Sequence, residues 1–144
     1  MIDVQFPEPQ FRLKKENGKQ YIFDDIRKRW LLLTEEEWVR QNFVAYLIKA
    51  LLYPSSLIAL EKEIVLNDLK KRFDILVYDQ QHQPWMMIEC KAQEIELNEE
   101  VLQQILRYNI SIPVPYIVIT NGTKTIAWEK GDDLQILSEL PTHS

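Results

Sequence analysis

Three charged side chains stand close together in a stretch that is otherwise largely apolar. Asp74 lies within Arg-Phe-Asp-Ile-Leu-Val-Tyr-Asp, and Glu89 and Lys91 follow a polar turn within Pro-Trp-Met-Met-Ile-Glu-Cys-Lys. Both segments are typical of β-strands. Because strand side chains alternate between faces, we expect Glu89 and Lys91 on one face and Cys90 on the other. Two acids and a lysine at the rim of an apolar sheet are the groups that metal-dependent cleavage of a phosphodiester requires.

The two acids are suited to a hard divalent cation. Asp74 and Glu89 can supply oxygen ligands from neighbouring strands, and the backbone carbonyl of Cys90 can complete the shell. Lys91 can orient the attacking water or help to deprotonate it. Mg²⁺ (or Mn²⁺) is the expected ion, because the two histidines of the chain fall in a turn and in the tail and form no cluster with its one cysteine.

A Glu-x-Lys triplet alone is a weak signal, since exposed strands often carry such an ion pair. The additional signal is Asp74 on a neighbouring strand together with a helix that follows directly. In that helix Gln104 and Tyr108 are four residues apart and therefore lie on one face.

A first helix is predicted to begin at Thr34, where Thr34 and Glu37 form a capping box. Its apolar face is formed by Val39, Phe43, Tyr46, Leu47, Ala50 and Leu51. Glu36 falls on this face, with Glu37 to its side. Two interpretations of Glu36 stay open: it belongs to the site, or it stabilises the helix N-terminus and pairs with Arg40.

The remaining pattern predicts an α/β fold, with a mixed sheet flanked by helices. Three strands in a meander are expected at 57–66, 73–78 and 85–91, followed by a helix from Asn98 to Asn109, a strand at 116–120, a turn at Asn121-Gly122 and a strand at 125–128. Residues 1–17 are interpreted as an extended, weakly structured lead-in, and short strands are expected at 21–23 and 30–33. We expect one domain over residues 1–144, with an N-terminal extension (1–29) and a core of about residues 30–130.

Composition limits the classes of protein that fit. The chain has 144 residues, is 46% hydrophobic and contains one cysteine, which excludes a disordered chain and an internal disulfide. No apolar run is long enough to span a membrane and no secretory signal is visible, so a cytoplasmic location is expected. The net charge of −5 does not favour a protein that coats nucleic acid along its length, because phosphate binding requires positive charge. A local basic cleft is still compatible, and Arg72 in the cluster Lys70-Lys71-Arg72 is a candidate DNA contact.

These motifs resemble the PD-(D/E)xK nuclease superfamily, and within it the N-terminal nuclease domain of type I restriction enzyme R subunits. The resemblance covers about residues 30–128 and is carried by Thr34 to Gln41, Lys71 to Val77, Ile88-Glu89-Cys90-Lys91-Ala92, Gln104 to Asn109 and Ile119-Thr120-Asn121-Gly122. It implies a restriction-endonuclease-like αβββαβ fold. The R subunits also carry a motor domain, whereas this chain shows no Walker-type phosphate loop.

The resemblance also implies roles for individual residues. Asp74 and Glu89 would bind the metal, Lys91 would be the catalytic lysine, and Gln104 and Tyr108 would support the site and contact DNA. Glu36 matches the acid of the first helix that approaches the metal. The implied activity is Mg²⁺-dependent cleavage of DNA, by the chain alone, as a homodimer, or with a helicase, motor or restriction-modification subunit.

Two alternatives accompany this reading. One is a catalytically silent module that keeps the nuclease fold and binds DNA or a restriction or helicase partner. The other is an incidental cluster of ion pairs with no role in chemistry.

Overall fold

The fold of the computed structural model, which describes residues 1–66 and 68–143, is built on a six-stranded mixed sheet. In spatial order its strands are β4 (Ile58–Leu66), β5 (Leu69–Tyr78), β6 (Pro84–Cys90), β7 (Tyr116–Thr120), β8 (Thr125–Lys130) and β9 (Leu134–Ile136). Neighbouring strands are antiparallel except β6 and β7, which are parallel. A parallel pair needs a crossover connection, and α2 (Glu99–Asn109) supplies it.

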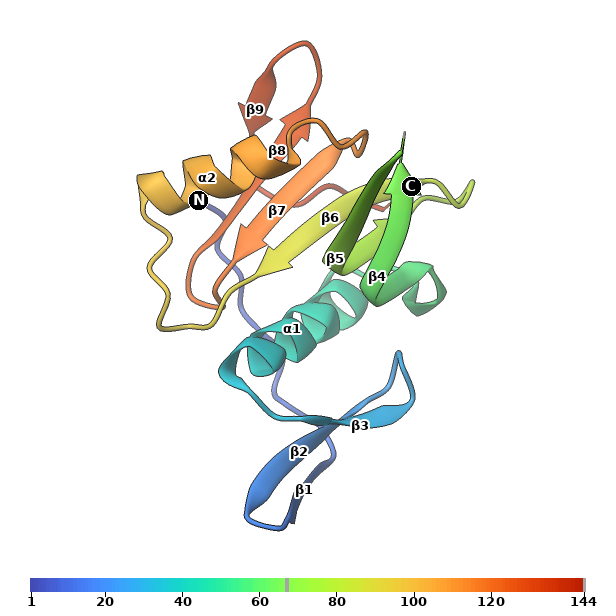
Figure 1. Cartoon of the computed structure of the whole chain (residues 1–144), viewed down its shortest axis with the longest axis vertical. Helices are drawn as coiled ribbons and strands as arrows, with labels where there is room; N and C mark the ends of the chain where they lie inside the picture. The colour runs from blue at the N-terminus through green and yellow to red at the C-terminus, as the bar shows by residue number, and fades with distance from the viewer. Residues whose placement is uncertain (67, 144) are drawn as a thin grey trace.

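One helix covers each face of this sheet (Figure 1). The helix α1 (Glu35–Ala45) continues as a π-helical segment (Tyr46–Ala50) and a later 3₁₀ turn (Ser55–Leu57). Phe43 and Leu47 are fully buried in the cluster that contains the sheet residues Ile75 and Ile88. On the other side Leu106 of α2 joins a second cluster with Met87, Ile117 and Ile119. The predicted α/β fold, a mixed sheet flanked by helices, is therefore confirmed. For the tail after Asp132 the sequence leaves a last strand or a helix open, and the structure has the strand β9 there.

The predicted order of helix, three strands, helix and strands agrees with the structure within a few residues. Asn98 is the N-cap of α2, as expected, and its side chain accepts a hydrogen bond of 2.9 Å from the amide of Val101. Asn121 stabilises the turn between β7 and β8 by accepting bonds from the amides of Thr123 and Lys124. The sequence also predicts a turn at Asn67 and Asp68, of which Asn67 lies outside the described residues.

The N-terminal third contains more structure than the sequence predicts. The strands β1 (Leu13–Glu16), β2 (Lys19–Asp24) and β3 (Arg29–Leu32) form a separate antiparallel sheet. The helix α1 lies between this small sheet and the large one (Figure 1). The lead-in is also packed: Ile2 is 5% exposed and its amide donates to the carbonyl of Thr125. Interpreting residues 1–17 as weakly structured was wrong, because Ile2 and the half-buried Val4 and Phe6 pack on the core.

The C-terminal tail is held in a similar way. The carbonyl of Pro141 accepts a 2.5 Å hydrogen bond from the Tyr53 hydroxyl, and the imidazole of His143 packs against the rings of Tyr53 and Trp85. The sequence predicts that the tail frays at Pro141, whereas the structure keeps it packed as far as His143. These partners are about 60 to 90 residues away along the chain, which is why local sequence patterns do not reveal them.

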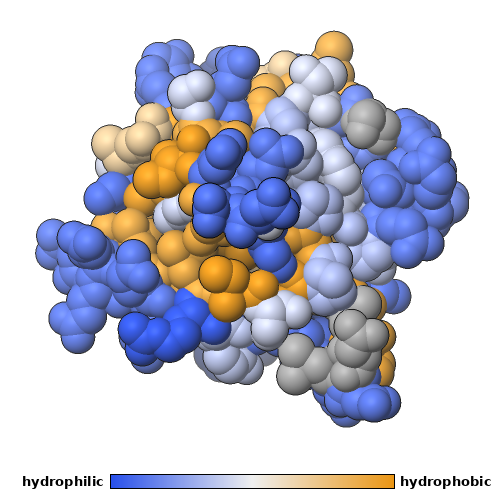
Figure 2. All heavy atoms as spheres, turned by 90° about the horizontal axis from the view of Figure 1, so that it is seen from above, coloured by the Kyte–Doolittle hydropathy of each residue, from blue (hydrophilic) through white to orange (hydrophobic). Residues whose placement is uncertain are grey.

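The outer surface of the molecule is uneven in polarity. Figure 2 shows apolar side chains gathered between hydrophilic groups on one face. Over the described residues, large exposed apolar side chains include Ile110 (49%) and Ile136 (67%). No helix in the described part of the chain is long and apolar enough to cross a membrane.

Candidate active site

Asp74 lies in β5 at the point where regular backbone pairing to β6 stops. The pairing of the two strands includes Ile75 with Ile88, and beyond it the Oδ2 atom of Asp74 accepts a 2.7 Å hydrogen bond from the amide of Cys90. A side chain thus takes the place of a backbone acceptor. The carboxylate of Asp74 is thereby fixed against the segment that carries Glu89 and Lys91.

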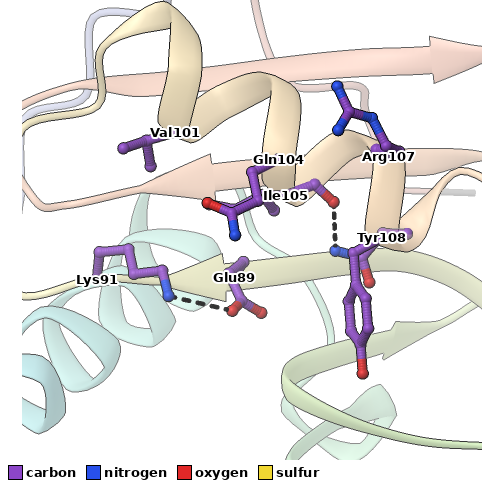
Figure 3. Close-up of a pocket in the computed structure, with 8 residues that line it drawn as sticks. Glu89, Lys91, Val101, Gln104, Ile105, Arg107 and Tyr108 are labelled. Atoms are coloured by element: carbon purple, nitrogen blue, oxygen red, sulfur yellow. Dashed lines mark hydrogen bonds and ion pairs between the residues drawn. The ribbon is translucent and has the colours of Figure 1, made fainter.

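Glu89 and Lys91 come from the end of β6. The Nζ atom of Lys91 is 3.7 Å from Oε1 of Glu89, as the alternation of strand side chains predicts (Figure 3). The amide of Lys91 donates to the carbonyl of Thr120, so the backbone remains attached to β7 one residue beyond the strand. Cys90 is 1% exposed in the core, which agrees with its expected place on the opposite face.

A cleft of about 620 Å³ opens beside this pair. Its polar lining includes Glu89, Lys91, Gln104 and Tyr108. In Figure 3 the side chain of Gln104 reaches from α2 toward β6, whereas Arg107 points away. From strand alternation we expect Asp74, Glu89 and Lys91 to share one cavity, with Gln104 near its wall. Of these four, Glu89, Lys91 and Gln104 line the cleft together. The expectation for Asp74 is wrong: Asp74 is not among the residues that line this cleft, because its carboxylate is engaged by the amide of Cys90 and lies toward Arg40.

A second, basic groove of about 450 Å³ shares Glu89 and Tyr108 with the first. Arg72 and Lys71 line it, together with Lys70. The side chain of Arg72 is 66% exposed and pairs with Glu61 at 2.8 Å. Lys71 is buried and places its ammonium over the exposed ring of Tyr108. Local sequence patterns place Lys71 in a basic cluster and at the start of the motif Lys71 to Val77, and they give no sign of its contact with Tyr108.

Burial and mutual repulsion raise the pKa values of the acids of the site. Burial, followed by the nearby charge of Asp74, raises the pKa of Glu89 to about 7, against an opposing effect of Lys91. Burial likewise raises the pKa of Asp74, although the Cys90 amide and Arg40 oppose the shift. Carboxyls whose charges are disfavoured in the free protein gain most from a bound cation.

Glu36 lies within the electrostatic reach of this group. It is partly buried at the start of α1, and its pKa is raised by burial and then by the charge of Asp74, while Arg40 and Lys91 lower it. Among the ion pairs of the described residues, none joins Glu36 to Arg40. The i,i+4 pair that one of the two interpretations of Glu36 includes is therefore not formed, because Arg40 is engaged by three other acids.

The buried guanidinium of Arg40 connects α1 to the strands. It lies 3.0 Å from Glu37, 2.5 Å from Glu61 and 3.7 Å from Oδ1 of Asp74. Its pKa is raised above its ordinary value by Glu37 and Glu61, in spite of the opposing effect of burial. The sequence suggests Glu36 as a partner of Arg40. It gives no sign of Glu61 and Asp74, which lie on β4 and β5.

Glu37 corrects another expectation. Thr34 caps α1 as predicted, with its Oγ1 accepting a 3.0 Å bond from the Glu37 amide. The Glu37 side chain is instead buried, 6% exposed, and accepts from Arg27, Arg40 and Gln41. Two guanidinium groups outcompete the backbone amide that a capping box would use.

Glu61 has an unusual backbone conformation opposite Asp74. The φ of Glu61 is +52°, in the left-handed region. Glu61 and Asp74 are left out of the regular pairing of β4 with β5, although the residues on either side of them are paired. The carboxylate of Glu61 lies between Arg40 and Arg72. Strained backbone of this kind is often found at functional sites, and here it directs an acid to the two arginines beside Asp74.

The donor set fits Mg²⁺ in kind and in number. Two carboxylates and a backbone carbonyl are hard oxygen ligands, and Mg²⁺ is commonly bound through one or two carboxylates with water in the other positions. Over the described residues, no group of three or more His, Cys, Asp or Glu side chains is placed to hold a metal. A protein-only cage is therefore absent from that part of the chain, and an ion held by Asp74 and Glu89 would take its other ligands from water.

The chain is similar to one described protein family and to solved structures. A family described as type I restriction enzyme R protein N terminus (HSDR_N) matches residues 35–141. A crystal structure of a candidate nuclease belonging to DUF820 from Anabaena variabilis is similar in fold, with 11% identity, a TM-score of 0.49, and coverage of 92% of this chain and 80% of that chain. Among curated proteins, none matches the chain.

Proposed function

The chain belongs to the family of type I restriction enzyme R protein N termini, and on this premise we propose that it is a Mg²⁺-dependent nuclease that hydrolyses phosphodiester bonds of DNA. The observation that supports this most is the convergence of Glu89, Lys91 and Gln104 on one cleft, with Asp74 bonded to the amide between Glu89 and Lys91. Such an arrangement is typical of the PD-(D/E)xK pattern.

Each residue has a defined task in this proposal. Asp74 and Glu89 would hold Mg²⁺ or Mn²⁺, with the carbonyl of Cys90 as a further ligand. The bound ion would supply Lewis acidity at the phosphate and lower the pKa of water. Lys91 would orient the attacking water and offset the charge that develops on the phosphoryl oxygens.

The reaction is a hydrolysis. The water oxygen forms a bond to phosphorus, the phosphorus–oxygen ester bond breaks, and the leaving alkoxide takes up a proton. Gln104, at the wall of the cleft, would hydrogen-bond the phosphate or the water. Arg72 and Tyr108, which line the adjoining groove, would contact the flanking DNA.

The experiment is a cleavage assay on supercoiled plasmid and on single-stranded DNA with Mg²⁺ or Mn²⁺. We expect wild type to cut and Lys91→Ala to lose the activity. Lys49→Ala is the matched control, because Lys49 is exposed and remote from the cleft, near Gln10. Cutting by Lys91→Ala at the wild-type rate would contradict the proposal.

The second candidate function is a nuclease-fold module that binds DNA, or a motor or restriction-modification partner, without cutting. The observation that favours it is the pairing of Asp74 with Arg40 and the Cys90 amide, which keeps this acid out of the lining of the cleft. Metal-independent DNA binding without cleavage on either substrate would support this candidate.

A further inference from the structure

The small sheet has an inner and an outer face of opposite character. In β2, Ile22 and Asp24 are fully buried, and the alternating residues Tyr21 and Phe23 are only half-buried. Asp24 belongs to the inner face, since it pairs with Arg27, which in turn pairs with Glu37 of α1. Tyr21 and Phe23 therefore point to the outer face, away from α1.

Strand register completes this outer face with aromatic and basic groups. Lys14 and Leu32 pair with Tyr21, and Trp30 pairs with Phe23. Residues directly opposite in an antiparallel pair share a face. The rings of Phe23 and Trp30 meet edge to face, with centroids 5.3 Å apart. Trp30 remains 36% exposed, although its side chain is a large and mostly apolar ring.

Cations lie directly over these rings. The guanidinium of Arg12 is 3.9 Å from the centre of Phe23, and the ammonium of Lys14 is 4.6 Å from the centre of Trp30. Both cationic side chains are exposed; Lys14 also has a solvent-exposed ion pair with Glu16 at 3.3 Å. An exposed pair of this kind contributes little and breaks readily when a better anion arrives.

Charge is strongly segregated along the chain. Residues 12–32 contain seven basic and three acidic residues, a net charge of +4, within a chain whose net charge is −5. Of the three acids, Asp24 is buried and paired on the inner face. The outer face therefore presents cations and aromatic rings together, within a positively charged segment of an acidic protein.

We propose that the outer face of the β1–β3 sheet is a second nucleic-acid site, separate from the cleft, and that it binds a single strand. Bases would stack on Trp30 and its aromatic neighbours, while Arg12, Lys14 and Lys19 would hold the phosphates. A single strand fits better than a duplex, because only unpaired bases expose the ring faces that aromatic side chains stack on. This face is on the far side of α1 from β6 (Figure 1), so its occupancy does not depend on catalysis in the cleft.

The test is binding of a fluorescently labelled twelve-nucleotide oligo(dT), followed by anisotropy with the full chain in EDTA. Stacking contributes about 1–3 kcal/mol per base, so Trp30→Ala should weaken binding at least about fivefold, and Trp30→Phe should recover part of the loss. The double variant Arg12→Gln/Lys14→Gln should bind more weakly with a shallower salt dependence. Lys62→Gln, which removes an exposed charge from β4, is the control for net charge and should bind as wild type does.

Three results would overturn the proposal. One is unchanged oligo(dT) affinity in a folded Trp30→Ala protein, with folding checked by circular dichroism. Another is a blunt duplex of equal length that binds as tightly as the single strand and is equally weakened by Trp30→Ala. The third is binding to phosphatidylserine vesicles without binding to the oligonucleotide. Tyr108→Ala tests the cleft separately: loss of binding only in that variant would assign the strand to the cleft.

Discussion

The carboxylate of Asp74 accepts a 2.7 Å hydrogen bond from the backbone amide of Cys90, the residue between Glu89 and Lys91. This bond ties the acid of β5 to the end of β6 where regular pairing has stopped. The two oxygens of Asp74 have different partners. Oδ2 accepts from the amide, and Oδ1 lies 3.7 Å from the guanidinium of Arg40. The position of this acid is therefore set by backbone as well as by charge.

The bond from Cys90 leads to a prediction about stability. Asp74→Ala leaves a buried amide without its acceptor, whereas Asp74→Asn retains an oxygen there and removes the repulsion with Glu89. We expect the alanine variant to be less stable than the asparagine variant by about 1–2 kcal/mol in urea unfolding with EDTA. Both should lose metal-dependent cleavage. Equal unfolding midpoints would show that the amide does not depend on this acceptor.

Glu89 gives the protein a pH-dependent stability in the absence of metal. Its pKa of about 7 lies above that of an unfolded chain, so the folded protein binds the extra proton between about pH 4.5 and 7. Stability from this group is therefore present at low pH and is lost as pH rises through 7, by at most roughly 3 kcal/mol. Glu89→Gln should remove this part of the slope.

The measurement is thermal unfolding of wild type and Glu89→Gln in EDTA at pH 5.5 and pH 8. The stability of the variant relative to wild type should increase with pH, because only wild type has to ionise the carboxyl. Mg²⁺ should bind wild type more tightly at pH 8, since proton and cation compete. A constant difference between the two proteins would mean that Glu89 titrates normally.

The sequence predicts the elements of the site well because its signals are local. The alternation around Glu89 and Lys91, the spacing of Gln104 and Tyr108, and the caps at Thr34 and Asn98 depend on neighbours within a few residues. All of these geometric expectations agree with the structure. The catalytic and metal-binding roles of the residues remain predictions.

The partners of Arg40 and Glu37 could not be predicted in the same way. Arg40 meets Glu61 and Asp74 across 21 and 34 residues of chain, and Glu37 meets Arg27 from the small sheet. Local rules assigned Glu37 to a capping box, and the tertiary ion pairs prevailed. Such contacts depend on how elements pack, which no spacing within one element reveals.

The buried guanidinium of Arg40 should contribute more to the stability of the fold than an exposed ion-pairing side chain does. Its side chain is 6% exposed and faces three acids, so Arg40→Gln leaves buried carboxylates without their cation. We expect a loss of about 3 kcal/mol or more in urea unfolding. The matched control is Arg72→Gln, which removes an exposed partner of the same Glu61 and should cost less than about 1 kcal/mol. Similar losses in both variants would contradict a special role for the buried guanidinium.

Glu36 and Glu35 allow the two interpretations of the first helical turn to be separated. Both acids stand near the N-terminus of α1, where either favours the helix. Glu35 is exposed, whereas Glu36 is partly buried and its pKa is raised by burial and by Asp74. If Glu36 belongs to the metal site, Glu36→Gln should weaken Mn²⁺ binding in a calorimetric titration several-fold, and Glu35→Gln should leave it unchanged. Because both substitutions remove one charge from the same helix turn, equal affinities in the two variants would assign Glu36 to the helix N-terminus alone.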